Sequence, residues 1–141
     1  MAERPERNWN IAPYFLVDNV VAAANYYRDQ LGFKYDRFWG EPPCFCMVHR
    51  SGITIMLSEL ERGSDESRPR SKPNPNGRAS GSDDCWDAYI WVEDAKALHD
   101  EFVSKSVKID RALCEKEYGC LDFDIVDLNG YRLCFGSQLN K

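Results

Sequence analysis

The two halves of this chain carry the same succession of short sequence patterns, 74 to 78 residues apart. The run YFLVDN at 14–19 aligns with YIWVED at 89–94, and FCMVHRSGITIMLS at 45–58 aligns without a gap with FDIVDLNGYRLCFG at 123–136. A long-period repeat indicates a supersecondary unit that cannot bury its apolar face alone and packs against a second unit. A fold for this chain therefore has to contain the same unit twice.

Each repeat begins with a β-rich run that ends in polar residues, and a helix-like stretch follows at 20–31 or 95–106. Asn19 and Asp94 come directly before these stretches, and both are residue types that cap helix N-termini. Later in each half, a Ser-Gly or Asn-Gly pair separates two alternating runs, which is the pattern of a β-hairpin. We therefore predict an α+β fold in which two tandem βαβββ modules form a curved mixed-sheet cleft.

A segment of different composition separates the two repeats. Residues 61–84 hold three of the seven prolines, and Ala79 is their only apolar residue. Such a segment cannot bury a core and is a loop or linker. We divide the chain into a first module at 1–60, a flexible linker or lid at 61–84 and a second module at 85–141, all within one structural domain. The patterns leave open whether the modules pair within one chain or exchange with a second copy.

The charge and the hydropathy of the chain disfavour several classes of partner. The sequence has 18 Lys and Arg against 23 Asp and Glu, a net charge of −5, and this disfavours nucleic acids and anionic membranes. No apolar run approaches the ~20 residues that span a bilayer, and the polar first ten residues lack the apolar segment of a signal peptide. We expect a cytoplasmic protein that keeps its cysteines as thiols.

Several repeated patterns resemble the vicinal oxygen chelate superfamily, which includes glyoxalase I, bleomycin-resistance proteins, fosfomycin-resistance enzymes and extradiol dioxygenases. YYRDQLGF at 26–33 is similar to the end of the family's helix, and 118–133 is similar to its Asp-Pro-Asp-Gly-Asn hairpin, with Leu128 in place of the usual proline. The resemblance covers roughly residues 10–60 and 85–137. It implies a cup-shaped sheet in each module, a cleft between paired modules and a homodimer. It leaves the chemistry open, because one scaffold supports many functions.

The resemblance also implies where a metal ion would be held. Metal-dependent members take their ligands from the first and last strand of each module, and these positions fall at Ala12, Met56, Asp87 and Cys134. Alanine has no donor atom, and a methionine thioether is a poor ligand for the hard or borderline ions of this chemistry. The two remaining groups fall short of the three protein ligands usual for catalytic zinc. We therefore predict no cofactor, and an unusual divalent site around Asp87 and Cys134 is the alternative.

Strand alternation predicts which side chains share the cleft face. The candidate ligand-binding residues are Tyr14, Leu16, Met56, Asp87, Tyr89, Trp91, Asp122, Asp124, Arg132 and Cys134. The gap-free alignment also places Cys44, Cys46 and Val48 on this face. The opposite parity of these strands is strongly apolar and is expected to form the core against the helices.

The predicted cleft combines rings with acids. Tyr14, Tyr89 and Trp91 can stack on a flat or cationic ligand, and the three aspartates can neutralise its charge. We predict a protein of glyoxalase/bleomycin-resistance type that binds a small aromatic or cationic organic molecule in a metal-free cleft. One alternative is a lyase, isomerase or dioxygenase with an atypical metal site, or with Tyr14, Tyr89 and Asp87 as acid and base. Another is an interaction module in which the rings only complete packing between modules and the aspartates are solvated.

Overall fold

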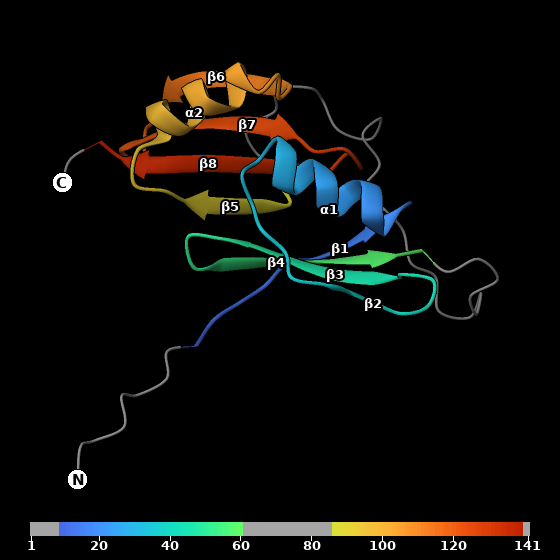
Figure 1. Cartoon of the computed structure of the whole chain (residues 1–141). Coiled ribbons are helices and arrows are strands. Elements are labelled where there is room, and N and C mark those ends of the chain that lie inside the picture. The colour runs from blue at the N-terminus through green and yellow to red at the C-terminus, as the bar shows by residue number, and fades with distance from the viewer. Residues whose placement is uncertain (1–8, 61–85, 140–141) are drawn as a thin grey trace, which may run out of the picture.

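The computed structural model describes residues 9–60 and 86–139, and the predicted linker or lid at 61–84 lies outside them. The first module comprises β1 (Tyr14–Val17), α1 (Val20–Asp29), β2 (Phe38–Trp39), β3 (Phe45–Arg50) and β4 (Ile53–Glu59). The second comprises β5 (Ala88–Trp91), α2 (Ala95–Ser104), β6 (Ile109–Glu115), β7 (Cys120–Val126) and β8 (Arg132–Gln138). The sheets have the orders β1-β4-β3-β2 and β5-β8-β7-β6 (Figure 1). The predicted α+β fold with two βαβββ modules is confirmed.

The helices begin where the sequence predicts. The Asn19 side chain accepts a hydrogen bond from the amide of Ala22 at 2.9 Å, and Asp94 accepts one from Ala97 at 3.0 Å. Both helices end two residues before their predicted limits. Gly32 and Ser106, just beyond these ends, have positive φ angles of 76° and 63°, and such backbone cannot continue a right-handed helix.

The first strand pairs with the last strand in each sheet. Tyr14 lies opposite Met56 in the parallel pair β1–β4, and Tyr89 lies opposite Cys134 in β5–β8. The offsets of 75 and 78 residues that relate the two halves of the sequence therefore hold for these four strands.

The gap-free alignment is wrong on β3, however, by one residue. Phe45 lies opposite Ser58, whereas Asp122 and not Phe123 lies opposite Gly136. The cause is the turn, because Ser51 and Gly52 alone close the first hairpin and residues 127–131 close the second. A one-residue slip exchanges the two sides of a strand. Phe45 and Met47 therefore lie opposite residues of the predicted cleft face, and Cys46 and Val48 are buried in the core. Cys44 precedes the strand.

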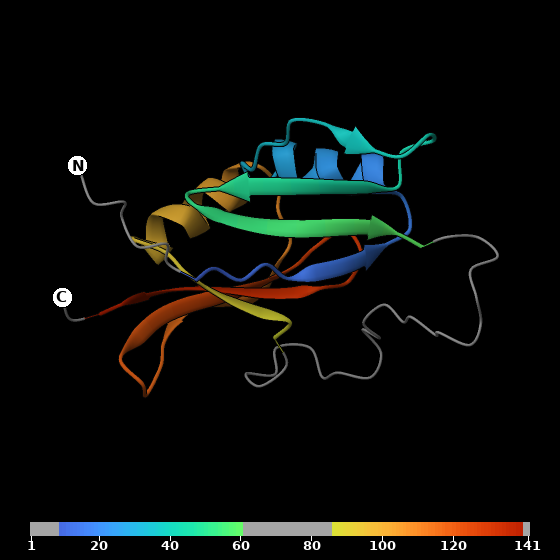
Figure 2. The same cartoon turned by 90° about the horizontal axis from the view of Figure 1, so that it is seen from below.

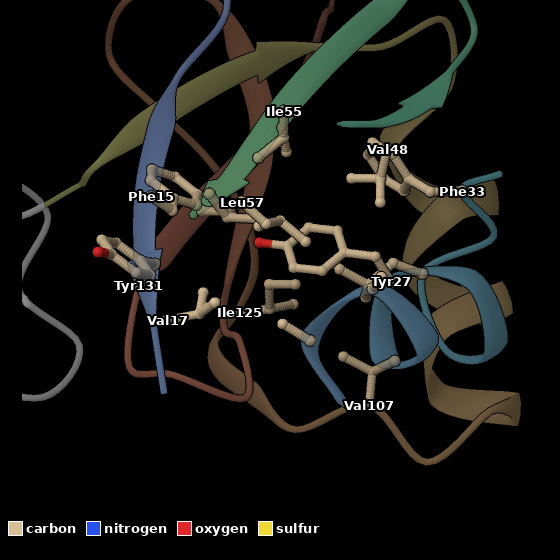
Figure 3. Packing of buried hydrophobic residues seen from close by; sticks show 14 of the residues in the cluster. Phe15, Val17, Tyr27, Phe33, Val48, Ile55, Leu57, Val107, Ile125 and Tyr131 are labelled. Carbon is tan, nitrogen blue, oxygen red and sulfur yellow. The ribbon is translucent and has the colours of Figure 1, made fainter. Parts of the chain in front are cut away.

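One hydrophobic core joins the helix-covered sides of both sheets. At one end of the module interface, the rings of Phe15 and Tyr131 stack with centroids 3.9 Å apart (Figure 3). The Tyr131 hydroxyl donates to the carbonyl of Leu16 at 2.8 Å and accepts from its amide at 2.7 Å. The Tyr27 hydroxyl donates to Asp127 at 2.5 Å. These contacts fix the first module against the loop between β7 and β8.

The opposite side of each sheet is its outer face. In Figure 1 the first sheet lies below α1 and the second sheet lies behind α2; Figure 2 shows the first sheet from its uncovered side. Because the modules meet through their helix-covered sides, the two outer faces point in different directions and do not face each other. One chain therefore does not close a cleft between the two sets of candidate residues.

Two further findings bear on the predicted surroundings of the protein. No helix among the residues described is long and apolar enough to cross a membrane. The five cysteines within 9–60 and 86–139 are thiols. The cytoplasmic location itself stays a prediction.

Candidate ligand-binding site

A buried ion-pair cluster lies at the outer face of the second sheet. Asp122 and Asp124 on β7 are fully buried. Arg111 on β6 donates to Asp122 at 2.6 Å and to both oxygens of Asp124 at 2.9 and 3.1 Å. Register shifts on either side of Arg111 place it opposite Asp124. Two carboxylates thus share one guanidinium, and the cluster carries one net negative charge when both are ionised.

Two phenols complete the hydrogen bonding of Asp122. Tyr89 on β5 and Tyr118 in the β6–β7 loop donate to the same oxygen, Oδ2, at 2.9 and 2.5 Å. Burial, followed by the hydrogen bond and charge of Asp122, raises the pKa of both phenols above the ordinary value. Tyr89 reaches Asp122 across Gly136, where a Cβ would overlap with the Tyr89 hydroxyl. The glycine therefore makes the contact possible.

Three aromatic rings form a ladder along the start of this module. The ring centroids of Trp86 and Tyr89 are 5.1 Å apart, and those of Tyr89 and Trp91 are 5.0 Å apart. Trp91 is 60% exposed and Tyr118 is 54% exposed. Ring surface is therefore open to solvent beside a buried charged cluster, which is a suitable setting for a ligand that carries both a ring and a charge.

The positions implied for a metal ion do not form a metal site. Ala12 precedes β1, and the Asp87 carboxylate accepts a hydrogen bond from the amide of Arg132 at 2.8 Å. Burial, together with the hydrogen bond and charge of Asp124, raises the pKa of Cys134, which makes this thiol a poor nucleophile. Within 9–60 and 86–139, no three His, Cys, Asp or Glu side chains are grouped so as to hold a metal. The residues present thus do not fit the ion that the resemblance implies.

The outer face of the first sheet is apolar where that of the second is charged. Tyr14, half exposed, lies opposite Met56 in the sheet and 6.4 Å from Phe45 between ring centroids. Trp39 lies 5.7 Å from Phe45 in the same measure, and the guanidinium of Arg37 lies 4.8 Å from the Trp39 ring. The aromatic rings and the Met56 thioether of this face are apolar surfaces that a partner can cover.

The structure brings together half of the predicted site residues. Tyr89, Trp91, Asp122, Asp124 and Cys134 lie together at the outer face of the second sheet. Tyr14 and Met56 share the outer face of the first sheet, and Asp87 pairs with the backbone of Arg132.

Two predicted residues are covered. Leu16 is buried. The Arg132 side chain, 5% exposed, forms an ion pair with Asp110 at 3.1 Å. Neither presents a surface to a ligand in this chain.

Three contributors lie outside the predicted set. Arg111 lies in a pattern at 108–111 that repeats 34–37, so its strand was expected, but nothing in the pattern indicates its partners. Trp86 lies two residues after the polar segment at 61–84, and Tyr118 lies in a loop. The sequence does offer one signal for the ladder, which is the tryptophan three positions before Tyr89.

Comparison with known proteins bears on the fold. No family model and no curated protein sequence matches the chain. TioX from Micromonospora sp. ML1 superposes with a TM-score of 0.73 at 14% identity, over 94% of this chain and 100% of that chain. A glyoxalase/bleomycin resistance protein/dioxygenase from Nocardioides does so with 0.68 at 13%, over 97% and 87%. The chain has the glyoxalase/bleomycin-resistance fold.

A third neighbour with this fold is the bleomycin-binding protein of Streptomyces verticillus, solved with copper(II)-bleomycin. Its TM-score is 0.62 at 22% identity, over 97% of this chain and 100% of that chain. The fold that the resemblance implies is therefore confirmed. Identities this low establish the fold alone, so the function has to be argued from the residues of the site.

Proposed function

We propose that this protein binds a small organic cation bearing an aromatic ring at the outer face of its second module, without a metal ion. The observation that carries the proposal is the open ladder Trp86–Tyr89–Trp91 beside a carboxylate pair that one guanidinium only half neutralises. Ring faces attract cations, by about 2 kcal/mol or more where the cation is desolvated. The residual negative charge of the cluster adds to that attraction.

The hydrogen bonding of the cluster favours a particular kind of cation. Asp122 and Asp124 are fully buried, and their oxygens already accept from Arg111, Tyr89 and Tyr118. A ligand therefore meets their charge at a distance and gains no direct hydrogen bond from them. A primary ammonium would lose hydration without finding acceptors. An N-alkylated or delocalised cation is less strongly hydrated, so it loses less hydration free energy on binding.

Arg111 is the reason for proposing a metal-free site. Burial lowers its pKa, but hydrogen bonds and charge contacts with Asp124 and Asp122 outweigh this and raise it above the ordinary value. The guanidinium thus supplies a permanent positive charge beside Cys134, at 3.6 Å from its sulfur. A divalent ion there would meet a cation instead of free carboxylates.

A second copy of the chain is proposed to cover the site. Tyr14, Trp39 and Trp91 are exposed on outer faces that one chain leaves open. Large exposed apolar side chains of this kind mark interaction surfaces. In the proposed homodimer, the first-module face of each copy lies over the second-module face of its partner. Tyr14→Glu should yield a monomer in light scattering coupled to gel filtration, and an unchanged dimer would contradict this arrangement.

The ligand proposal is tested by tryptophan fluorescence of chelator-treated protein. The probes are benzyltrimethylammonium, its uncharged isostere neopentylbenzene, and benzylamine. The quaternary cation should bind about tenfold more tightly than either, which corresponds to roughly 1.4 kcal/mol of cation–π and charge attraction. Trp91→Leu and Tyr118→Leu should weaken it, and Trp9→Leu, on a fully exposed residue away from both sheets, should not. Equal binding of the neutral isostere, or no saturable binding of any probe, would overturn the proposal.

A further inference from the structure

The interface between the modules is tight at one end and hollow at the other. Phe15 and Tyr131 close the first end by stacking. At the second end, the tip of the β3–β4 hairpin faces β5 and α2 across a cavity of about 610 Å³. This volume lies within the roughly 300–1,000 Å³ typical of small-molecule sites. Trp91, the last ring of the ladder, also lines the cavity, so the cavity and the outer-face site are neighbours.

The inner wall of the cavity is apolar and comes from both modules. Phe33 and Ile53 line it from the first module. Ile90, Leu98 and Phe135 line it from the second module. Phe33 and Phe135 are buried, whereas Ile53, Ile90 and Leu98 are only partly buried. Apolar surface therefore remains that a bound molecule would remove from water, and such burial favours binding.

The charged groups on the hairpin side of the cavity are engaged with one another. Arg50 on β3 donates to both carboxylate oxygens of Glu101 on α2, at 2.8 and 2.9 Å, and to the carbonyl of Leu31 at 2.6 Å. The ammonium of Lys105 lies 3.6 Å from the same carboxylate. The guanidinium and the carboxylate are therefore matched before any ligand arrives.

The carboxylates on the helix side of the cavity also have partners. Asp94 accepts a hydrogen bond from the amide of Ala97 at 3.0 Å, which caps α2, and its charge acts on the ammonium of Lys96. Glu93 has an interaction partner as well. Among the described residues, each charged group that lines the cavity is thus already engaged. An ionic ligand would lose hydration here without gaining a free counter-ion.

We propose that this cavity is a second binding site, which takes an uncharged, largely apolar small molecule seated between Ile53, Ile90 and Leu98. The matched charges around it favour a neutral ligand over a cation or an anion with the same body. Because the walls belong to both modules, a bound molecule also holds the modules together. The inference goes beyond the proposed function and does not require a cation at the outer face, although the two sites share Trp91.

The test uses three fluorescent probes that share a dansyl body and a five-carbon chain. N-pentyldansylamide ends in a methyl group, dansylcadaverine in an ammonium and dansyl-6-aminohexanoic acid in a carboxylate. The neutral probe should bind saturably, with enhanced, blue-shifted emission. Its affinity should exceed that of either charged probe by at least about tenfold, because only the charged ends lose hydration without a free counter-ion.

Substitutions on α2 and at the outer face locate that binding. Ala97 is an exposed residue of α2 that lines the cavity, so Ala97→Trp fills it from the mouth without entering the core and should abolish binding of the neutral probe. Ala97→Leu, a smaller change, should weaken it by an intermediate amount. Val103→Trp, on an exposed residue of the same helix outside the lining, is the matched control and should bind normally. Tyr118→Leu, outside the lining, should weaken benzyltrimethylammonium but not the neutral probe.

Three results would overturn the inference. One is equal binding of the neutral probe to wild type and Ala97→Trp, or no saturable binding to either. Another is a loss in Tyr118→Leu as large as in Ala97→Trp, which would place the probe at the outer face. The third is binding of a charged probe as tight as that of the neutral one.

The two proposals fail separately. If benzyltrimethylammonium does not bind, the outer-face proposal fails, and the expected binding of N-pentyldansylamide is unchanged. Neopentylbenzene is uncharged and can also enter the cavity, so its affinity for the outer face is measured in Ala97→Trp.

Discussion

The two modules share one backbone plan and differ at the outer faces of their sheets. The register places Phe45 and Met47 at positions that correspond to Asp122 and Asp124 in the second module. Met56 likewise corresponds to Cys134. The first sheet therefore presents a surface that a protein partner can cover, and the second presents rings beside a buried charge. The two modules thus share the order of their strands and differ in the chemistry of their outer faces.

A single small residue marks this divergence. Gly136 leaves space for the Tyr89 ring to cross β8 and bond to Asp122. Ser58 occupies the corresponding position in β4, where Tyr14 remains half exposed. The difference shows how a glycine in a strand can permit a close side-chain approach that its repeat partner does not make.

The largest expected difference between the modules comes from removing the Arg111 guanidinium at the outer face of the second sheet. Arg111→Met should lower the free energy of unfolding by about 3–5 kcal/mol, because Asp122 and Asp124 would remain buried without a positive partner. Arg37→Met, on an exposed arginine of the first module, should cost less than about 1 kcal/mol. Urea unfolding at pH 7 measures both. Similar small losses in the two variants would mean that the buried cluster is not the distinguishing feature of the second module.

The longer hairpin of the second module contains Asp127, whose carboxyl group makes the stability of the protein depend on pH. Burial raises the pKa of Asp127 to about 6, despite hydrogen bonds from Tyr27 and two backbone amides that lower it. The folded protein then binds this proton more tightly than the unfolded chain does. The Asp127 contribution to stability is therefore present below the ordinary carboxyl pKa and is lost as pH rises to about 6 and beyond, by about 3 kcal/mol in all.

Asp127→Asn is the variant that isolates this contribution, because the other carboxyl groups are common to both proteins. The free energy of unfolding of the wild type, relative to that of the variant, should fall between pH 4 and 7. A series of urea titrations at different pH values measures it. A difference that stays constant across that range would show that Asp127 titrates at its ordinary value.

A smaller effect is expected from Gly136→Ala. The added methyl group forces Tyr89 away from Asp122 and should cost about 1–3 kcal/mol through overpacking and the lost hydrogen bond. It should also shift the fluorescence of the neighbouring tryptophans. Ser58→Ala in the first module should change stability by less than about 0.5 kcal/mol. If the two alanine variants behave alike, Gly136 does not organise the site.

The sequence alone predicts the architecture well, because the repeat determines it. The βαβββ order and the caps Asn19 and Asp94 follow from local patterns. Capping and alternation depend on residue type and spacing, and these are visible in a sequence.

The site was less predictable, because it depends on loop lengths and tertiary pairing. The extra residues of the second hairpin shift the register of β3 relative to β7, and alternation then misassigns Cys46 and Val48. The register shifts in β6 place Arg111 against the aspartates, and a bulge of this kind has no clear sequence signature. Arg132 was expected at the ligand surface but pairs with Asp110 in the interior. The packing of modules through their helix-covered sides was also left open by the sequence.

The most direct test of a metal-free outer face on the second sheet is thermal unfolding of chelator-treated protein titrated with Mn²⁺, Fe²⁺, Ni²⁺ and Zn²⁺. An ion at one hundred times its dissociation constant would stabilise the fold by about 2.7 kcal/mol. For a domain of this size, that corresponds to a midpoint shift on the order of 10 °C. We predict no saturable shift with any of the four ions. A saturable shift that Asp87→Ala or Asp124→Ala abolishes would contradict the account and would assign the face to a metal centre.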